Sequence, residues 1–444
     1  MMHVISRRIA LSVVALTLLF SGQRADAAGF AINEWGARSI SLGNAVTAMA
    51  DDPSAIVFNP AGLAQLEGLG IMAGVAVVSP SFGYTVAAPN SDSEVDIDGE
   101  RQFFPIPALY ATYRVHDRLA VGLGVYSSFG LGIKWPQTID VAGQQTAWWG
   151  RSLIQEVDLK TAFITPTVAL KLHERVLLGG GLNIVQAAVL LKRANTNSAA
   201  IADDINVELA AEDLAFGGNV GLLIKAIPKR LNIGVTYRSA LSLTFEGDAV
   251  FSKADGSLPE GMRLLLIDSK GRAGLKLPHT FSFGVAAFPI DRLKVGAALD
   301  VITWSSYKEL AIDLLDENGE RRPSSTSEPK NWHNTIAARV GAEFMLTPDI
   351  PLRLGFVYDQ SPVPKQTVSA ELPDADRYEW TLGAGYRWRK LTADLGYMFL
   401  LTGDKKAAPE APLSTSNGAG QRRAATYRAS AHILALTLGY TFDI

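Results

Sequence analysis

The chain has 444 residues, with 41 Lys and Arg against 44 Asp and Glu, 48% hydrophobic residues and no cysteine. The lack of cysteine excludes a disulfide framework, a thiolate metal site and a cysteine nucleophile. The near balance of charge argues against a nucleic-acid partner, which would need a basic face. This length corresponds to two or three soluble domains or to one large β-barrel.

Residues 1–27 have the composition of a secretory signal peptide. Arg7 and Arg8 precede the apolar run 9–20, and Ala25-Asp26-Ala27 follows as a cleavage site of the A-x-A type. The alternative is an uncleaved helical anchor, but twelve helical residues cover only about 18 Å, which is short of a bilayer core about 30 Å thick. We therefore expect cleavage after Ala27 and a location in a bacterial envelope.

Residues 28–68 show no strand alternation and form a separate segment. The small residues 42–50 predict a short helix that ends at Asp51-Asp52-Pro53, and Asn59-Pro60 predicts a turn. One interpretation is a periplasmic extension. The other is a plug inside the lumen that the following residues enclose.

From residue 69 onward, period-two alternation is common and helical periodicity is scarce. In residues 378–388 one face is formed by Tyr378, Trp380, Leu382, Ala384, Tyr386 and Trp388. Ten residue steps span roughly 33 Å, which projects to about 25 Å at a tilt of about 40°. That is the height of the lipid-facing band of an outer-membrane barrel, and aromatic residues at both ends of one face suit its two interfaces.

The loops provide an independent count of the strands. Six short polar turns occur near residues 117, 174, 229, 290, 348 and 390, and they alternate with seven longer polar stretches at about 80–102, 130–156, 192–215, 253–271, 313–330, 359–376 and 403–428. Thirteen connections separate fourteen strands. The sequence therefore predicts an all-β fold, a 14-stranded antiparallel transmembrane β-barrel over residues 69–444, with short turns in the periplasm and long loops outside.

The segment before the barrel resembles the N-terminal hatch of the FadL/TodX family of outer-membrane transporters. The resemblance is carried by Ala28-Gly29-Phe30, Asn33-Glu34, residues 42–45, Ala50-Asp51-Asp52 and Asn59-Pro60-Ala61-Gly62, and also by residues 359–364 and 372–378. It implies a barrel closed by a hatch over residues 28–68, with Asn33 in it. Asn59, Pro60 and Ala61 would form a wedge-like turn, and Asp51 and Asp52 would either bond to basic residues of the wall or cap a helix end.

The same resemblance implies a route for a hydrophobic cargo. In the family, loops around the third and fifth strands form an outer groove, a pocket lies beside the N-terminus (here Phe30), and a kinked third strand lets cargo leave sideways. The corresponding opening would be Ser128, Phe129, Gly130 and Leu131, although an ordinary strand end is the alternative. Trp135, Trp148 and Trp149 would line the groove, unless they pack the loop onto itself.

Basic residues near these loops are candidates for pairing with a carboxylate cargo. Lys192 and Arg193 leave the fifth strand on its outer side, and Lys308 follows the ninth strand. Solvated surface charge is the alternative for these residues. A fatty acid would use such cations, whereas an arene or alkane would need only apolar walls.

The sequence offers no catalytic or metal-binding signature. The six histidines are scattered and no GxSxG elbow is present, so we expect no enzyme activity, metal or cofactor. The expected function is passive uptake of long-chain fatty acids or aromatic or aliphatic hydrocarbons by an outer-membrane monomer that contacts lipid and lipopolysaccharide. The alternatives are a general porin, a barrel-borne lipid hydrolase, and an adhesin or phage receptor, a role that could coexist with transport.

Overall fold

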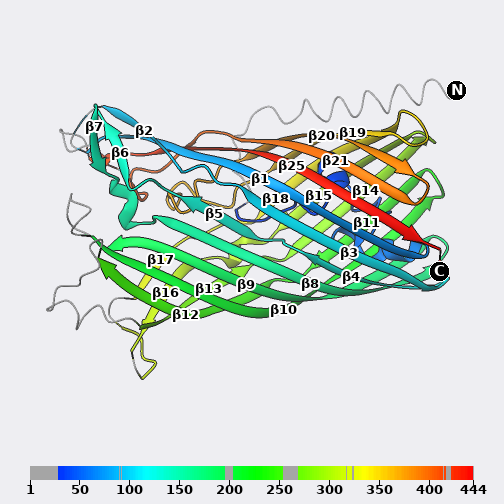
Figure 1. The fold of residues 1–444 in the computed structure, drawn as a ribbon, viewed down its shortest axis with the longest axis horizontal. Helices are drawn as coiled ribbons and strands as arrows, with labels where there is room; N and C mark the ends of the chain where they lie inside the picture. The colour runs from blue at the N-terminus through cyan, green and yellow to red at the C-terminus, as the bar shows by residue number, and fades with distance from the viewer. Residues whose placement is uncertain are drawn as a thin grey trace.

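A computed structural model describes residues 29–89, 91, 93–195, 204–253, 269–316, 318–322, 325–413, 415–416 and 422–443 (Figure 1). The predicted signal peptide, residues 1–27, lies outside the described residues. No helix in the described ranges has the length and apolar character needed to cross a membrane.

The described chain forms a closed antiparallel β-barrel of fourteen strands, as predicted. The first strand, β1, pairs along its length with the last, β25, from Leu69↔Phe442 to Thr85↔Thr426, and this pairing closes the barrel. The strands in chain order, with the two pieces of an interrupted strand given together, are β1 (Leu69–Ala87), β3 (Phe104–His116), β4 with β5 (Leu119–Tyr126, Gly130–Lys134), β8 (Glu156–His173), β9 (Val176–Asn195), β10 (Ile205–Ile227), β11 with β12 (Leu231–Arg238, Leu241–Lys253), β14 with β13 (Thr280–Ile290, Ser269–Leu277), β15 with β16 (Leu293–Ile302, Glu309–Leu315), β18 with β17 (Thr335–Met345, Thr326–Pro329), β19 (Pro351–Asp359), β20 (Arg377–Trp388), β21 (Leu391–Thr402) and β25 (Thr426–Phe442).

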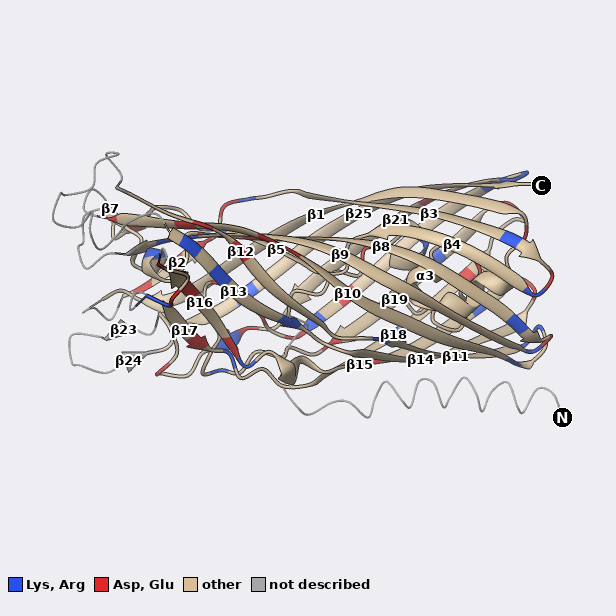
Figure 2. Cartoon of the chain, turned by 90° about the horizontal axis from the view of Figure 1, so that it is seen from below, with Lys and Arg blue, Asp and Glu red and all other residues tan. Residues whose placement is uncertain are grey.

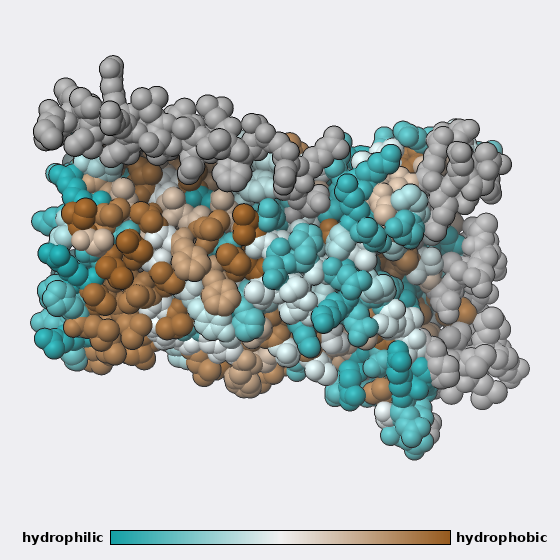
Figure 3. All heavy atoms as spheres, turned by 180° about the vertical axis from the view of Figure 1, so that it is seen from behind, coloured by the Kyte–Doolittle hydropathy of each residue, from teal (hydrophilic) through white to brown (hydrophobic). Residues whose placement is uncertain are grey.

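The outer face of the barrel is apolar, as the alternation predicts. Leu434, Leu436 and Leu438 of β25 are 55, 50 and 50% exposed, and Trp380 and Trp388 of β20 are 47 and 55% exposed. Figure 3 shows these hydrophobic side chains gathered in a band over one half of the barrel, with a hydrophilic rim at the near end and a more polar surface on the other half. A band of this kind places the exposed hydrophobic side chains in lipid, where they lose no contact with water.

The connections differ at the two ends of the barrel. Two-residue turns such as Asp117-Arg118 and Arg389-Lys390 lie at one end, which we call the short-turn end, and the long connections lie at the other, the long-loop end (Figure 1). Charged residues occur at both ends (Figure 2). Several strands extend beyond the polar boundaries that the sequence suggested: β9 continues to Asn195 and β10 starts at Ile205, because ladder pairing needs only backbone groups.

Shorter strands belong to the long-loop end. They are β2 (Glu94–Asp98), which pairs with β1, the hairpin of β6 (Thr138–Val141) and β7 (Gln144–Ala147), β22 (Lys405–Lys406), and the pair of β23 (Thr415–Ser416) and β24 (Arg422–Arg423). Two 3-10 turns, η2 (Trp149–Ser152) and η4 (Trp304–Ser306), lie in the connections that follow β7 and β15.

Residues 29–68, which we call the N-terminal segment, lie within the barrel near its short-turn end (Figure 1). The segment contains α2 (Ala37–Ser41), α3 (Ala55–Phe58) and η1 (Pro60–Gln65). The helix predicted for residues 42–50 is wrong. Gly43 and Asn44 both adopt a φ of 58°, and two successive left-handed residues interrupt a helix, so residues 42–50 form turns.

Candidate functional site

Glycines in the wall make room for the N-terminal segment. A Cβ at Gly341 of β18 would lie within 3.0 Å of the carbonyl oxygen, carbonyl carbon and Cα of Leu42, so only glycine allows this approach. The inward-facing glycines that approach residues 37–63 in this way form a group that we call the glycine belt, which comprises Gly122, Gly124, Gly179, Gly221, Gly234, Gly284, Gly296, Gly341, Gly355, Gly383 and Gly396. They come from ten strands, and the segment is therefore packed against most of the wall.

Asn59 joins the segment to the wall with its side chain. The amide Nδ2 donates to the carbonyl oxygens of Thr47, within the segment, and Leu222 of β10, at 2.9 and 3.1 Å. The amide Oδ1 accepts from the backbone of Ala61 at 3.2 Å, which caps η1 with Pro60 in its first position. All three residues of the predicted wedge are buried, and Gly179 and Gly221 of the wall lie directly against them.

A network of ion pairs holds the segment at the short-turn end. Arg38 of α2 pairs with Asp51 and Asp52 at 2.7 Å each and with the fully buried Glu343 of β18 at 3.0 Å. Lys294 of β15 pairs with Asp51 at 2.8 Å, so a basic residue of the wall does contact one of the two aspartates. Burial raises the pKa of Asp51, but Arg38 and Lys294 outweigh burial and hold that pKa well below its usual value.

Asp52 has a second role within the segment. Its carboxylate accepts from the backbone N–H of Ser54 at 2.9 Å and from the Ser54 hydroxyl at 2.5 Å, just before α3. The two readings that the sequence left open, a bond to a cation and capping of a helix start, therefore both apply to Asp52. The cation is Arg38 of the same segment.

The third strand is interrupted where the N-terminal segment reaches it. Strand β4 ends at Tyr126 and β5 begins at Gly130, and the segment pairs with the residues between them. The Ile32 N–H donates to the Ser128 carbonyl at 2.9 Å, the Gly130 N–H donates to the Phe30 carbonyl at 3.0 Å, and Ala31 forms an isolated bridge with Phe129. The segment thus provides the backbone partners that an uninterrupted ladder would have provided.

The interruption also leaves an unpaired stretch between two neighbouring strands. Strand β3 pairs with β4 only from Leu109 onward, and within the described residues β5 pairs only with β8. The Phe104 side chain of β3 lies against β5, because a Cβ at Gly132 would fall within 3.0 Å of three atoms of the Phe104 ring. A side chain rather than a hydrogen-bonded ladder therefore covers this part of the wall.

An apolar chamber lies toward the long-loop end, bounded by the N-terminal segment and by connections of the loops. Its empty volume is about 780 Å³, its opening to solvent included, a size that suits a small organic ligand. Its apolar lining includes Phe30, Leu131, Ile154, Val157, Leu159, Val189, Leu191, Phe245, Leu275, Tyr307, Leu310, Trp332, Val363 and Leu372.

One ion pair lies in the lining of the apolar chamber. Lys330 is in an ion pair with Glu371 and lies 3.2 Å from a carboxylate oxygen of Glu328. Burial raises the pKa of Glu371, although the ammonium of Lys330 acts in the opposite direction. The positive charge of Lys330 is therefore already balanced by protein carboxylates.

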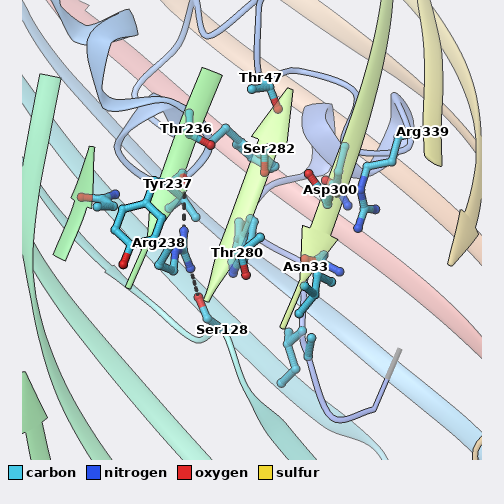
Figure 4. A pocket seen from close by; sticks show the side chains of 18 of the residues that line it. Asn33, Thr47, Ser128, Thr236, Tyr237, Arg238, Thr280, Ser282, Asp300 and Arg339 are labelled. Carbon is cyan, nitrogen blue, oxygen red and sulfur yellow. Dashed lines mark hydrogen bonds and ion pairs between the residues drawn. The ribbon is translucent and has the colours of Figure 1, made fainter. Parts of the chain in front are cut away.

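A second chamber, which is polar, adjoins the interruption of the third strand (Figure 4). Its lining combines Asn33 and Thr47 of the N-terminal segment with residues of β11, β14, β15 and β18. Figure 4 shows Arg238 extending from the end of β11 toward Ser128, while Asp300 and Arg339 face each other on the opposite side. The Arg339 Nε donates to Asp300 at 2.8 Å.

A layer of aromatic rings separates the two chambers. The Phe30 ring packs against Phe129, Trp304, Tyr307 and Trp332, with ring centroids 4.9 to 6.3 Å apart. Phe30 and Leu131 face the apolar chamber, whereas Ala31 and Phe129, their chain neighbours, face the polar chamber. The predicted opening, Ser128 to Leu131, therefore borders both chambers.

The structure places the other predicted groove residues away from both chambers. Trp135 and Trp148 are 2% and 0% exposed and stack on each other at 5.3 Å, and the Trp148 indole donates to the Tyr84 hydroxyl at 2.7 Å. Trp149 packs beside them, partly buried. These tryptophans pack the loop against β1, which was the alternative interpretation, because burial of three indoles stabilises a loop strongly.

The predicted cations also occupy other places. Lys192 lies between Glu156 and Glu208, at 3.8 and 3.2 Å, and Arg193 lines a small neighbouring cavity. The Lys308 side chain is exposed, and only its backbone carbonyl has a contact near the chambers, with the N–H groups of Lys330 and Asn331. Arg238, Arg339 and Lys330, which do line the chambers, were not among the predicted residues. An isolated cation in a strand gives no local signal that would single it out.

Comparison with known proteins identifies the family. Residues 18–442 match the family model described as outer membrane protein transport protein (OMPP1/FadL/TodX). A putative outer membrane protein of Neisseria meningitidis serogroup B is 25% identical, with 97% of this chain and 98% of that protein aligned, and a long-chain fatty acid transport protein of Salmonella typhi is 24% identical, with 88% and 91% aligned.

The fold agrees with this assignment. The crystal structure of a Pseudomonas aeruginosa FadL homologue superimposes with a TM-score of 0.77 over 94% of this chain and 100% of that one, at 21% identity. The family model covers most of the chain and the fourteen-stranded barrel is common to both structures. The chain therefore belongs to the OMPP1/FadL/TodX family of outer membrane transport proteins.

Proposed function

We propose that this protein takes up hydrophobic compounds by passive diffusion, with the apolar chamber as the holding site and the interrupted third strand as the exit. The observation that carries the proposal is the position of Leu131 and Phe129, which belong to the interruption and also line the two chambers. A hydrophobic solute gains about 25 cal/mol for each Å² that it removes from water, so capture in this chamber needs no energy source.

The N-terminal segment acts as a hatch in this proposal. It packs on the glycine belt, closes the bore toward the short-turn end, and pairs with the strand interruption through Phe30 and Ile32. Movement of residues 30–32 away from Ser128 and Gly130 would connect the apolar chamber with the gap beside Phe104. The cargo then leaves sideways into the hydrocarbon layer and does not cross the water-filled periplasm.

Asn59→Ala tests the role of the hatch. The substitution removes the hydrogen bonds to Thr47 and Leu222 at a cost of about 1–3 kcal/mol, while the glycine belt still holds the segment in the bore. We expect uptake of a hydrocarbon probe to fall by about 5-fold or more, with glucose permeability in proteoliposomes unchanged. A rise in glucose permeability with unchanged hydrocarbon uptake would instead favour a general porin.

Phe104→Ala tests the exit. Removing the ring that covers Gly132 should widen the unpaired stretch between β3 and β5, so we expect faster transfer of probe from the protein to lipid, by about 3- to 10-fold, with little change in affinity. Stopped-flow transfer of a fluorescent hydrocarbon to liposomes measures the rate. Phe103→Ala is the matched control, because Phe103 is the neighbouring residue and is 69% exposed. Equal rates for both variants would contradict a lateral exit here.

The enzymatic alternative has a direct test. A lipid hydrolase would release acyl chains from phospholipid or ester substrates, so we expect no such release from purified protein. Acyl release above the background of a Ser128→Ala variant, which removes a chamber-lining hydroxyl, would replace the transport proposal.

A further inference from the structure

Arg238 has an unusual environment for a cation inside this barrel. Its Nη1 donates to the Ser128 hydroxyl at 2.8 Å and its Nη2 donates to the Val57 carbonyl at 3.0 Å (Figure 4), and both acceptors are neutral. The guanidinium also lies over the rings of Trp35 and Tyr126, at 5.2 and 5.9 Å from their centroids. Among the described residues it forms no ion pair, whereas Lys192, Lys330 and Arg339 each contact a carboxylate.

The chamber around Arg238 has further polar capacity. Its charged lining consists of Arg238, Arg339 and Asp300, so it carries a net charge of +1. Asn44, Asn219 and Arg339 are 3, 7 and 4% exposed, and each has at least one buried polar atom without a hydrogen-bond partner in the described part of the chain. Buried polar groups without partners are costly, and their concentration around one cavity indicates a ligand that supplies the missing partners.

We propose that Arg238 binds the carboxylate of an amphipathic cargo, so that the polar chamber takes the ionised head of a long-chain fatty acid whose tail occupies the apolar chamber. A carboxylate forms charge-assisted hydrogen bonds roughly twice as strong as neutral ones, and its two oxygens match the guanidinium fork, so it displaces the Ser128 hydroxyl and the Val57 carbonyl. This inference rests on the proposed transport function and names its substrate class.

The same exchange ties cargo to the exit. Arg238 holds Ser128, the central residue of the strand interruption, and Trp35 donates its indole N–H to the carbonyl of the adjoining Ser127 at 2.5 Å. When Arg238 turns to a carboxylate, Ser128 loses its side-chain donor and Val57 of the N-terminal segment loses its contact with the wall. The arrival of an acidic head group therefore loosens the segment and the interruption together, which a neutral hydrocarbon does not do.

The decisive experiment measures the affinity of the purified full-length protein for hexadecanoate and for methyl hexadecanoate at pH 8. For the wild type we expect hexadecanoate to bind about 10-fold or more tightly than the ester. Arg238→Gln should bring the two affinities within about 3-fold of each other while the ester affinity stays the same, and Arg238→Lys should keep much of the preference because it keeps the charge. Unchanged ester affinity in Arg238→Gln also shows that the variant has folded.

Two controls locate the effect. Arg272→Gln removes a cation that is paired with Glu246 at the rim of the barrel and should leave the preference intact. Lys192→Gln removes the cation that the sequence suggested, and loss of the preference in that variant would overturn the assignment to Arg238. An undiminished preference in Arg238→Gln would also overturn it. Failure of the wild type to bind either probe would instead refute the proposed function.

Hydrogen exchange provides a readout of the coupling. Hexadecanoate should speed amide exchange in residues 127–130 of the wild type, whereas methyl hexadecanoate should not. In Arg238→Gln the two probes should have the same effect. Faster exchange with both probes in the wild type would show that the head group does not operate the exit.

Discussion

Gly341→Val is expected to drive the N-terminal segment out of the barrel and open the bore. A branched side chain at this position meets the backbone of Leu42 and cannot rotate away from it, because even its Cβ would lie within 3.0 Å of three Leu42 atoms. Overpacking typically costs about 1–3 kcal/mol, which changes the ratio of docked to undocked segment by about 10- to 100-fold. Conductance across planar bilayers should rise accordingly, and protease should cleave residues 29–68 in intact protein.

Gly403→Val is the matched control for this substitution. A Cβ at Gly403 meets nothing within 4 Å, so conductance and protease resistance should equal those of the wild type. The heat-dependent gel mobility typical of folded barrels distinguishes an empty barrel from an unfolded chain. A folded Gly341→Val barrel with unchanged conductance would mean that the segment does not close the bore.

Glu343→Gln is expected to destabilise the short-turn end by about 3–5 kcal/mol, because it leaves several buried cations without their shared partner. Glu343 is fully buried, accepts from Arg38 and Arg353 at 3.0 and 2.7 Å, and lies 3.2 Å from Lys294. The temperature at which the compact gel band disappears should fall, and the segment should become accessible to protease because Arg38 loses its contact with the wall.

Glu246→Gln removes a comparable carboxylate from an exposed pair. Glu246 and its partner Arg272 are 61 and 47% exposed, and exposed pairs contribute about 0–1 kcal/mol, so this variant should melt close to the wild type. Arg38→Ala gives a third point. Glu343 keeps Arg353 and Lys294 in that variant, so the barrel should lose less stability than in Glu343→Gln while the segment is still released.

The sequence alone was sufficient for the architecture. Alternation such as that of Leu434, Leu436 and Leu438 sets which face meets lipid, and this pattern depends only on the two-residue period of a strand. The spacing of polar turns gave the number of strands for the same reason. The motif around Asn59 and Pro60 was local as well, since the cap on Ala61 lies within the motif itself.

The chambers, in contrast, were decided by contacts between distant parts of the chain. Arg238 meets Ser128 across 110 positions and Val57 across 181, and Gly29 donates to Asp374 across 345. Which inward-facing side chains meet depends on how strands tilt and stagger around a closed barrel, and a single strand carries no record of that register.

The tryptophans and lysines of the outer loops illustrate the same limit. Composition marks Trp148 as a residue that must be buried, but not whether cargo or Tyr84 buries it, and a lysine such as Lys192 is available to a ligand only if no carboxylate lies opposite. The periodicity of the backbone therefore determined the barrel from sequence. Only the closed barrel determined which charges remain unpaired inside it, because pairing is a property of facing strands and not of any one of them.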